Sequence, residues 1–177
     1  MAYLAKPQIA ELLEALRARQ TAPHTAMVAC ICLATGARWG EAQALRPNSI
    51  KGNSLVFSNT KSKRVRVVPV SPSLIDAIRQ HWNQHGPFSN CIGVFRKILL
   101  ATSIDPPRGQ SSHILWHTFA AHFIMGGGHI VTLKEILGHA SLSMTMRYAH
   151  LAPDHLNDAI RLGPMADFDT YSTPANA

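Results

Sequence analysis

The sequence predicts one mainly α-helical domain that carries a small antiparallel β-sheet. Apolar residues recur at helical spacing along most of the chain, and only two short segments, 55–57 and 65–68, have the β-branched and aromatic composition of strands. The chain has 177 residues, of which 46% are apolar and 15% charged. That length and composition suffice for a single buried core, and they exclude a disordered or fibrous chain.

Two helices are expected in the first 36 residues. Pro7 is followed by apolar residues at i, i+3, i+4 and i+7, which is the spacing of an amphipathic helix with proline in its first turn. Residues 25–35 are apolar almost all round and stop at Gly36, which is typical of a buried helix with a glycine cap. We expect this second helix at the centre of the core.

A short helix and a β-hairpin are expected next. Residues 35–47 form the short helix, which a proline closes and which places Arg38 and Glu41 on adjacent faces. The two strands then pair through the linking segment 58–64. Four basic side chains occupy this hairpin within six residues: Lys61, Lys63, Arg64 and Arg66.

Helices are expected through most of the remaining chain. Prolines and glycines mark their ends, most clearly at the three glycines 126–128 and at Gly138. The tail 163–177 is rich in small and polar residues, and we expect it to be flexible. The expected helices cover residues 72–82, 91–100, 113–125, 130–137, 141–150 and 153–162.

The charge of the chain points to a polyanionic partner. Seventeen Lys and Arg side chains stand against ten Asp and Glu, which gives a net charge of +7. The excess is concentrated in residues 1–150, whereas residues 151–177 hold one arginine and four aspartates. A polyanion is therefore expected to bind the body of the domain and not its tail.

The cysteines and the hydropathy pattern indicate a cytosolic protein. Cys30, Cys32 and Cys91 are an odd number without the spacing of metal ligands, so we interpret them as reduced core residues. No apolar stretch is long enough to span a bilayer, and the N-terminus lacks the pattern of a signal peptide. Secretion and membrane insertion are not expected.

Four motifs occur together in the chain. They are Thr-Gly-Ala-Arg38-x-x-Glu41, Lys61 eight residues before a proline, His113-x-Leu-x-His-Thr-Phe, and Leu-Gly-His139 with Tyr148 nine residues later. In this order they resemble the tyrosine recombinases of the phage integrase family, and most of all the integrases of P2-type temperate phages. The resemblance covers about residues 5–160 and corresponds to the catalytic domain of that family.

The resemblance implies metal-free and ATP-free DNA strand cleavage, with no cofactor. Tyr148 is the expected nucleophile, which forms a 3′-phosphotyrosyl bond and leaves a free 5′-hydroxyl. Arg38 is expected to clamp the phosphate, since a guanidinium can fork onto two oxygens that gain negative charge in the transition state. His113 is the expected general base, Lys61 the proton donor to the departing 5′-oxygen, and His139 a further hydrogen-bond donor to the phosphate.

Further residues are given supporting roles by the same resemblance. Glu41 and His117 are expected to orient the catalytic side chains, and neighbouring DNA backbone is expected to be contacted by Lys63, Arg64, Arg66 and Arg147. Each residue alone has a simpler interpretation. A helical histidine is more often a hydrogen-bonded core residue, a tyrosine is more often packing, and Arg38 alone could form a surface ion pair with Glu41.

One position departs from the family pattern. The family places a second arginine three residues after the position of His113, and this chain has Trp116 there. An indole has one N–H donor and no charge, so it cannot clamp a phosphate. We therefore expect strongly impaired cleavage, and the alternative function is an inactive DNA-binding or regulatory protein on the same fold.

Two other enzyme classes are less well supported. A metal enzyme could use His113, His117 and His122, but the glutamate of a zinc-protease helix does not follow His113. A type IB topoisomerase shares the tyrosine chemistry, but the short chain and the Leu-Gly-His139 motif favour a recombinase.

The resemblance also predicts organisation, partners and location. Residues 1–162 are expected to be the catalytic domain and residues 163–177 the tail, with the N-terminal core-binding and arm-binding domains absent from this chain. The partners are double-stranded DNA at attachment sites and further copies of the chain, in the cytoplasm of a bacterial host at the nucleoid and without a membrane. Protomers could exchange C-terminal tails, or the segment after Tyr148 could instead fold back on its own domain; its apolar residues are Leu151, Leu156, Ile160 and Leu162.

Overall fold

A computed structural model describes residues 2–58, 65–107 and 109–153 of the chain. The predicted helix 153–162, except for Pro153, and the predicted flexible tail lie outside these residues, as do Lys61, Lys63 and Arg64. The helices are α1 (Lys6–Ala18), α2 (Pro23–Thr35), α3 (Trp39–Gln43), α4 (Pro72–His85), α5 (Ile92–Leu100), α6 (His113–Met125), α7 (Ile130–Leu137) and α8 (Ser143–Met146), with 3-10 turns η1 (Pro47–Ser49) and η2 (Ala149–Leu151). The strands are β1 (Ile50–Lys51), β2 (Ser54–Phe57) and β3 (Arg66–Pro69).

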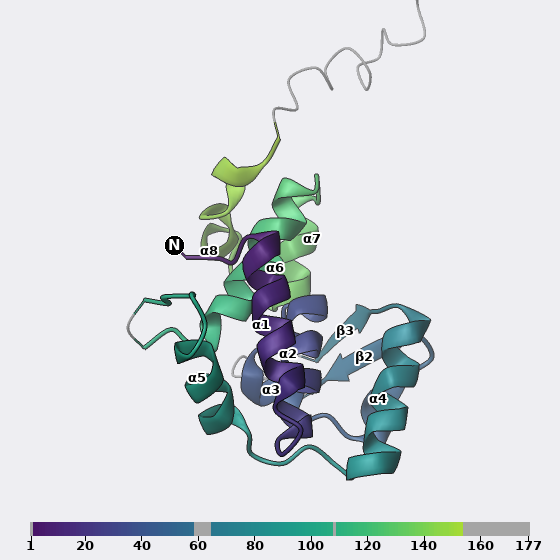
Figure 1. Cartoon of the computed structure of the whole chain (residues 1–177). Helices are drawn as coiled ribbons and strands as arrows, with labels where there is room; N and C mark the ends of the chain where they lie inside the picture. Colours follow the sequence, from purple (N-terminus) through teal and green to yellow (C-terminus); the bar gives the residue numbers. More distant parts are fainter. Residues whose placement is uncertain (1, 59–64, 108, 154–177) are drawn as a thin grey trace, which may run out of the picture.

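The predicted fold class is confirmed, and helix α2 lies at its centre. Figure 1 shows α4 and the sheet on one side of the central helices and α5 on the other. Helix α2 contacts α1, α3, α4, α5 and α6, which explains why its sequence is apolar almost all round. It ends as predicted at Gly36, which has a left-handed φ of 63° and donates its N–H to the carbonyl of Cys32 at 3.0 Å.

The sheet contains the predicted hairpin and one further strand. Its order is β1-β2-β3, and all pairs are antiparallel, with Leu55 opposite Val68 and Phe57 opposite Arg66. The third strand was missed because β1 has only two residues and so shows no alternating pattern. Alternation is clear in β3, where Arg66 and Val68 are buried while Val67 is 58% exposed.

The C-terminal helices follow the predicted breaks, with one difference. Helices α6 and α7 begin and end at the predicted residues, but the helix predicted over 141–150 is split into α8 and η2. The split is caused by tighter i to i+3 bonds, in which the N–H of Tyr148 donates to Thr145 and that of Leu151 donates to Tyr148. As a result the Tyr148 side chain turns inward and is fully buried.

The segment ahead of α1 is bound to α6. The backbone N–H of Leu4 donates to the hydroxyl of Thr118 at 2.9 Å, and the Leu4 carbonyl lies 2.8 Å from Nε2 of His122. The Leu4 side chain is 1% exposed within the main core. Figure 1 shows the same arrangement, since the N-terminal segment runs beside α6.

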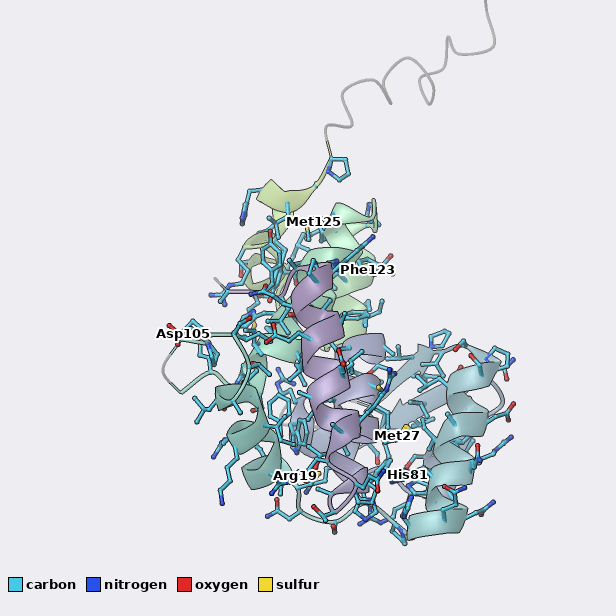
Figure 2. All side chains as sticks on the ribbon, in the orientation of Figure 1. Arg19, Met27, His81, Asp105, Phe123 and Met125 are labelled. Atoms are coloured by element: carbon cyan, nitrogen blue, oxygen red, sulfur yellow. The ribbon has the colours of Figure 1, made fainter. Side chains whose placement is uncertain are left out.

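A cluster of histidines lies between α2 and α4. Nδ1 of His24 is 2.8 Å from Nε2 of His81, and the His81 ring packs on His85 and on Phe88. In the view of Figure 2, His81 lies at the end of the molecule away from Met125 at the end of α6. The burial of His81 and the neighbouring His24 and His85 lower its pKa to about 4.

The cysteines occupy the predicted environment. Cys32 and Cys91 are buried, Cys30 is half-buried, and all three are free thiols. Over the described parts of the chain, every helix is too short or too polar to cross a bilayer.

Candidate active site

Most of the predicted catalytic residues within the described part of the chain meet around the ring of Trp116. Trp116 is the fourth residue of α6, in its first turn, and His117 follows it. The other groups come from the start of α3, the turn after α7 and the segment after α8. From the Trp116 ring centre, the Arg38 guanidinium carbon is 5.6 Å away, and the ring centres of His117, His139 and Tyr148 are 5.0, 5.2 and 6.3 Å away. The position that departs from the family pattern is therefore at the centre of the site.

Arg38 is held in place by Glu41. Arg38 precedes the first turn of α3, so the carboxylate of Glu41 three residues later accepts its backbone N–H at 3.0 Å and its guanidinium at 3.1 Å. The ion pair between these two residues is thus present. The Arg38 side chain nevertheless remains 28% exposed, which leaves donors of the guanidinium free to face an incoming group.

Arg66 differs from the prediction for this residue. It was expected to contact DNA backbone, but its side chain is 4% exposed and forms an ion pair with Glu41. Its other terminal nitrogen donates to the carbonyl of Ile136 in α7. The prediction of a surface phosphate contact is wrong for Arg66, because the strand alternation turns this side chain to the buried face of the sheet.

Tyr148 is hydrogen-bonded to His117. Its hydroxyl lies 2.7 Å from Nδ1 of His117, and the Tyr148 side chain is 0% exposed. Burial raises the pKa of Tyr148, and the nearby positive charge of Arg147 opposes that shift. Burial first, and then the charge of Arg147, lower the pKa of His117 to about 4, so His117 is neutral at pH 7 and its Nδ1 can accept a hydrogen bond from the tyrosine hydroxyl.

The direct contact of His117 with Tyr148 was missed by the sequence prediction. His117 was assigned a supporting role, and His113 was assigned as general base. His113 lies one turn earlier on α6, is exposed and lines a pocket together with Arg38. The available signal was the i, i+4 spacing of the two histidines, which places both on one face of the helix.

His139 is positioned by the glycine turn that ends α7. Gly138 has a left-handed φ of 67°, and the N–H groups of Gly138 and His139 donate to Glu135 and Lys134 at 3.1 Å each. The ring is 2% exposed, and its Nδ1 lies 2.7 Å from the hydroxyl of Thr145. Burial first, then the charges of Arg38, Arg147 and Arg66, lower the pKa of His139 to about 4.

A pocket of about 250 Å³ opens beside Trp116. Arg38 and His113 supply its polar edge, and Trp39 and Ile92 contribute apolar surface. The Trp116 indole N–H is buried and has no hydrogen-bond partner. The pocket therefore combines one guanidinium and one imidazole, which could face an oxyanion, but it also contains the Glu41 carboxylate and carries less positive charge than two arginines would give.

Other predicted residues complete the description. Arg147 is exposed, one residue before Tyr148. Lys61, Lys63 and Arg64 lie outside the described residues, so their predicted roles are not tested. Within residues 2–58, 65–107 and 109–153, no group of three or more His, Cys, Asp or Glu side chains is arranged to hold a metal ion.

The model of the phage integrase family matches residues 2–155. The chain is 45% identical to the integrase of Escherichia phage 186 over 93% of this chain and 48% of that protein, and 42% identical to the integrase of Escherichia phage P2 over 92% and 47%. It is similar to the solved catalytic domain of bacteriophage HP1 integrase, with a TM-score of 0.81, 39% identity and 99% of both chains covered. The chain thus spans about half the length of the phage 186 and P2 integrases.

Proposed function

Because the chain belongs to the phage integrase family, we propose that residues 1–162 act as the catalytic domain of a tyrosine site-specific recombinase, which integrates phage DNA by breaking and rejoining DNA strands. The observation that supports this most directly is the meeting of Arg38, His139 and Tyr148 around one residue of α6. These groups come from three separate parts of the chain. A purely structural core would not require a guanidinium, an imidazole and a phenol at one point.

The proposed reaction begins with Tyr148. Its oxygen attacks the scissile phosphorus, the bond from phosphorus to the 5′-oxygen breaks, and a 3′-phosphotyrosyl linkage remains. His113 takes the phenol proton, and Lys61 donates a proton to the departing 5′-oxygen. Arg38 donates hydrogen bonds to the non-bridging oxygens, and the buried His139 adds one once the site has opened; rejoining reverses each step.

Tyr148 must leave its position before it can attack. Its hydroxyl is bonded to His117 and its side chain is fully buried, so a DNA phosphate cannot reach it there. Releasing the side chain breaks this hydrogen bond, at about 0.5–1.5 kcal/mol net, and also exposes the buried ring, so contacts made with DNA must offset both costs. In this conformation His117 therefore holds the hydroxyl of the nucleophile inside the domain.

Trp116 limits the rate of this chemistry. Loss of one donor to a transition state typically slows a reaction by about 10²–10³-fold, and loss of an arginine in phosphoryl transfer by about 10³–10⁵-fold. We therefore propose slow cleavage by this chain. The uncharged and unpartnered indole of Trp116 also favours the second candidate function, a DNA-binding regulator that keeps the fold without the activity.

The proposed partners are attachment-site DNA and further copies of the chain. Exposed Arg147, together with Lys63 and Arg64, would contact the DNA backbone near the scissile phosphate. Protomers assembled on DNA would exchange the C-terminal segment that carries Leu156, Ile160 and Leu162. The place of action would be the nucleoid of the bacterial host.

The test is to restore the second arginine. Trp116→Arg is incubated with nicked duplexes whose central base pairs are randomised, and the covalent protein–DNA adduct is separated on a denaturing gel. We expect adduct formation at least about 100-fold faster than in the unchanged chain. Tyr148→Phe in the same background is the matched control and is expected to form no adduct. Equal adduct levels with and without Tyr148, or no gain from Trp116→Arg, would contradict the proposal.

A further inference from the structure

Arg66 joins two halves of the proposed site that are far apart in sequence. One terminal nitrogen of its guanidinium pairs with Glu41, which also holds Arg38. The other terminal nitrogen donates to the carbonyl of Ile136, in the last turn of α7. Arg66 thus connects Glu41, which holds Arg38, to the end of α7, which is followed by His139.

The contact with the end of α7 is tight. A Cβ atom on Gly138 would lie 2.5 Å from Cδ and 3.1 Å from Nε of Arg66, so the arginine stem packs directly on the glycine turn. His139 is the next residue, and its ring faces Trp116 from that turn. A change in the position of Arg66 would therefore displace the glycine turn that positions His139.

An arginine is needed for this contact, and a lysine cannot replace it. Two separate nitrogens of one rigid planar group bind two acceptors that belong to different elements, whereas an ammonium is a single point charge on a flexible stem. The guanidinium lies 5.3 Å from the centre of the Phe57 ring, and the side chain is 4% exposed. A DNA phosphate cannot reach a group that is enclosed in this way.

We propose that Arg66 is a positioning residue for strand cleavage, which fixes Arg38 through Glu41 and His139 through the end of α7 without touching the DNA. The proposal rests on the proposed function, because it assigns Arg66 a part in the same site. It also replaces the role of backbone contact that the sequence predicted for this residue.

The first measurement separates positioning from DNA contact. Arg66→Lys is made in the Trp116→Arg background, and Arg147→Gln serves as the comparison for a surface phosphate contact. For Arg66→Lys we expect the rate of adduct formation at saturating DNA to fall about tenfold or more, while DNA affinity changes by about twofold at most. For Arg147→Gln we expect weaker DNA binding and a slope of log affinity against log salt that is less steep by about one. Arg66→Lys behaving like Arg147→Gln, or keeping its full rate, would overturn the proposal.

The second measurement does not depend on activity. The side-chain nitrogens of His139 are followed by NMR during a pH titration of the otherwise unchanged chain carrying Arg66→Met or Arg66→Lys. Arg38 and Arg147 also face His139, so we expect the pKa of His139 to rise partway toward its ordinary value in Arg66→Met, and its Nδ1 signal to shift in both variants. Arg79→Met, on the outer face of α4, is the control and should change neither signal.

The two measurements distinguish failure of the proposal from failure of the proposed function. If Trp116→Arg forms no adduct, the proposed function is contradicted, and the His139 titration alone decides the role of Arg66. If His139 keeps its pKa and its Nδ1 signal in folded Arg66→Lys and Arg66→Met, the assignment of Arg66 is wrong. Should Arg66→Met fail to fold, Arg66→Lys carries the test through the Nδ1 signal, because it retains the positive charge beside Glu41.

Discussion

Gly36 provides a test of how the site is held together by backbone packing. It ends α2 with a φ of 63°, two residues before Arg38. A Cβ atom at this position would lie 2.5 Å from Cδ1 of Phe119 in α6 and 2.7 Å from Cδ2 of Leu137 in α7. The left-handed conformation costs an alanine about 1–2 kcal/mol, and overpacking of a core typically costs about 1–3 kcal/mol. Gly36→Ala is therefore expected to lower the free energy of unfolding by about 2–5 kcal/mol.

The chain offers a matched control for the packing part of this cost. Gly52, in the turn between β1 and β2, has a φ of 56°, and a Cβ atom there would meet nothing within 4 Å. Gly52→Ala should therefore lose only the conformational part, about 1–2 kcal/mol. Urea denaturation followed by circular dichroism gives both values, provided that the denaturant slopes agree. If Gly36→Ala loses no more stability than Gly52→Ala, the close approach of α2 to α6 and α7 is not as described.

Two further predictions concern stability. The pKa values of His81, His117 and His139 are about 4 in the folded chain and about 6.5 when unfolded, so the unfolded state binds more protons between these values. The free energy of unfolding should fall as the pH drops from about 6.5 toward 4, by up to about 3 kcal/mol for each histidine, and urea midpoints at pH 7 and pH 5 that coincide would contradict this. Thr118→Val should cost about 1–3 kcal/mol, because it leaves the N–H of Leu4 buried without its acceptor, and thermal unfolding beside the unchanged chain measures the loss.

The helices could be predicted because their apolar faces recur with the helical period and glycines mark their ends. Helices α6 and α7 match residue for residue, since the glycine segments that follow them interrupt the pattern sharply. The segment after α8 could not be predicted, because it contains neither proline nor glycine before Ala152. The inward turn of Tyr148 depends on tertiary contacts with His117 and Trp116, which no local pattern specifies.

The site residues that belong to sequence motifs could be predicted, whereas the hydrogen-bond partners of these residues could not. Arg38, His139 and Tyr148 could be found from the spacing of four motifs. The partner of Tyr148 could not, because His117 is 31 residues away and several histidines compete for the role. Arg66 was assigned from its basic neighbours, and the alternation of Val65, Arg66 and Val67 also favours an outward arginine, whereas the structure buries Arg66 and exposes both valines. The inward direction of Arg66 is set by its contacts with Glu41 and Ile136, which are 25 and 70 residues away and leave no local signal.

The attachment of Leu4 to α6 has a mechanical consequence. Two hydrogen bonds, to Thr118 and His122, clamp the chain ahead of α1 onto the helix that also carries Trp116. A displacement of the polypeptide at Leu4 is therefore passed to α6 through these two bonds, as well as to the main core through the buried Leu4 side chain. In a longer protein that continues upstream of residue 1, a movement of the upstream part would reach α6, the helix that carries Trp116, through this segment.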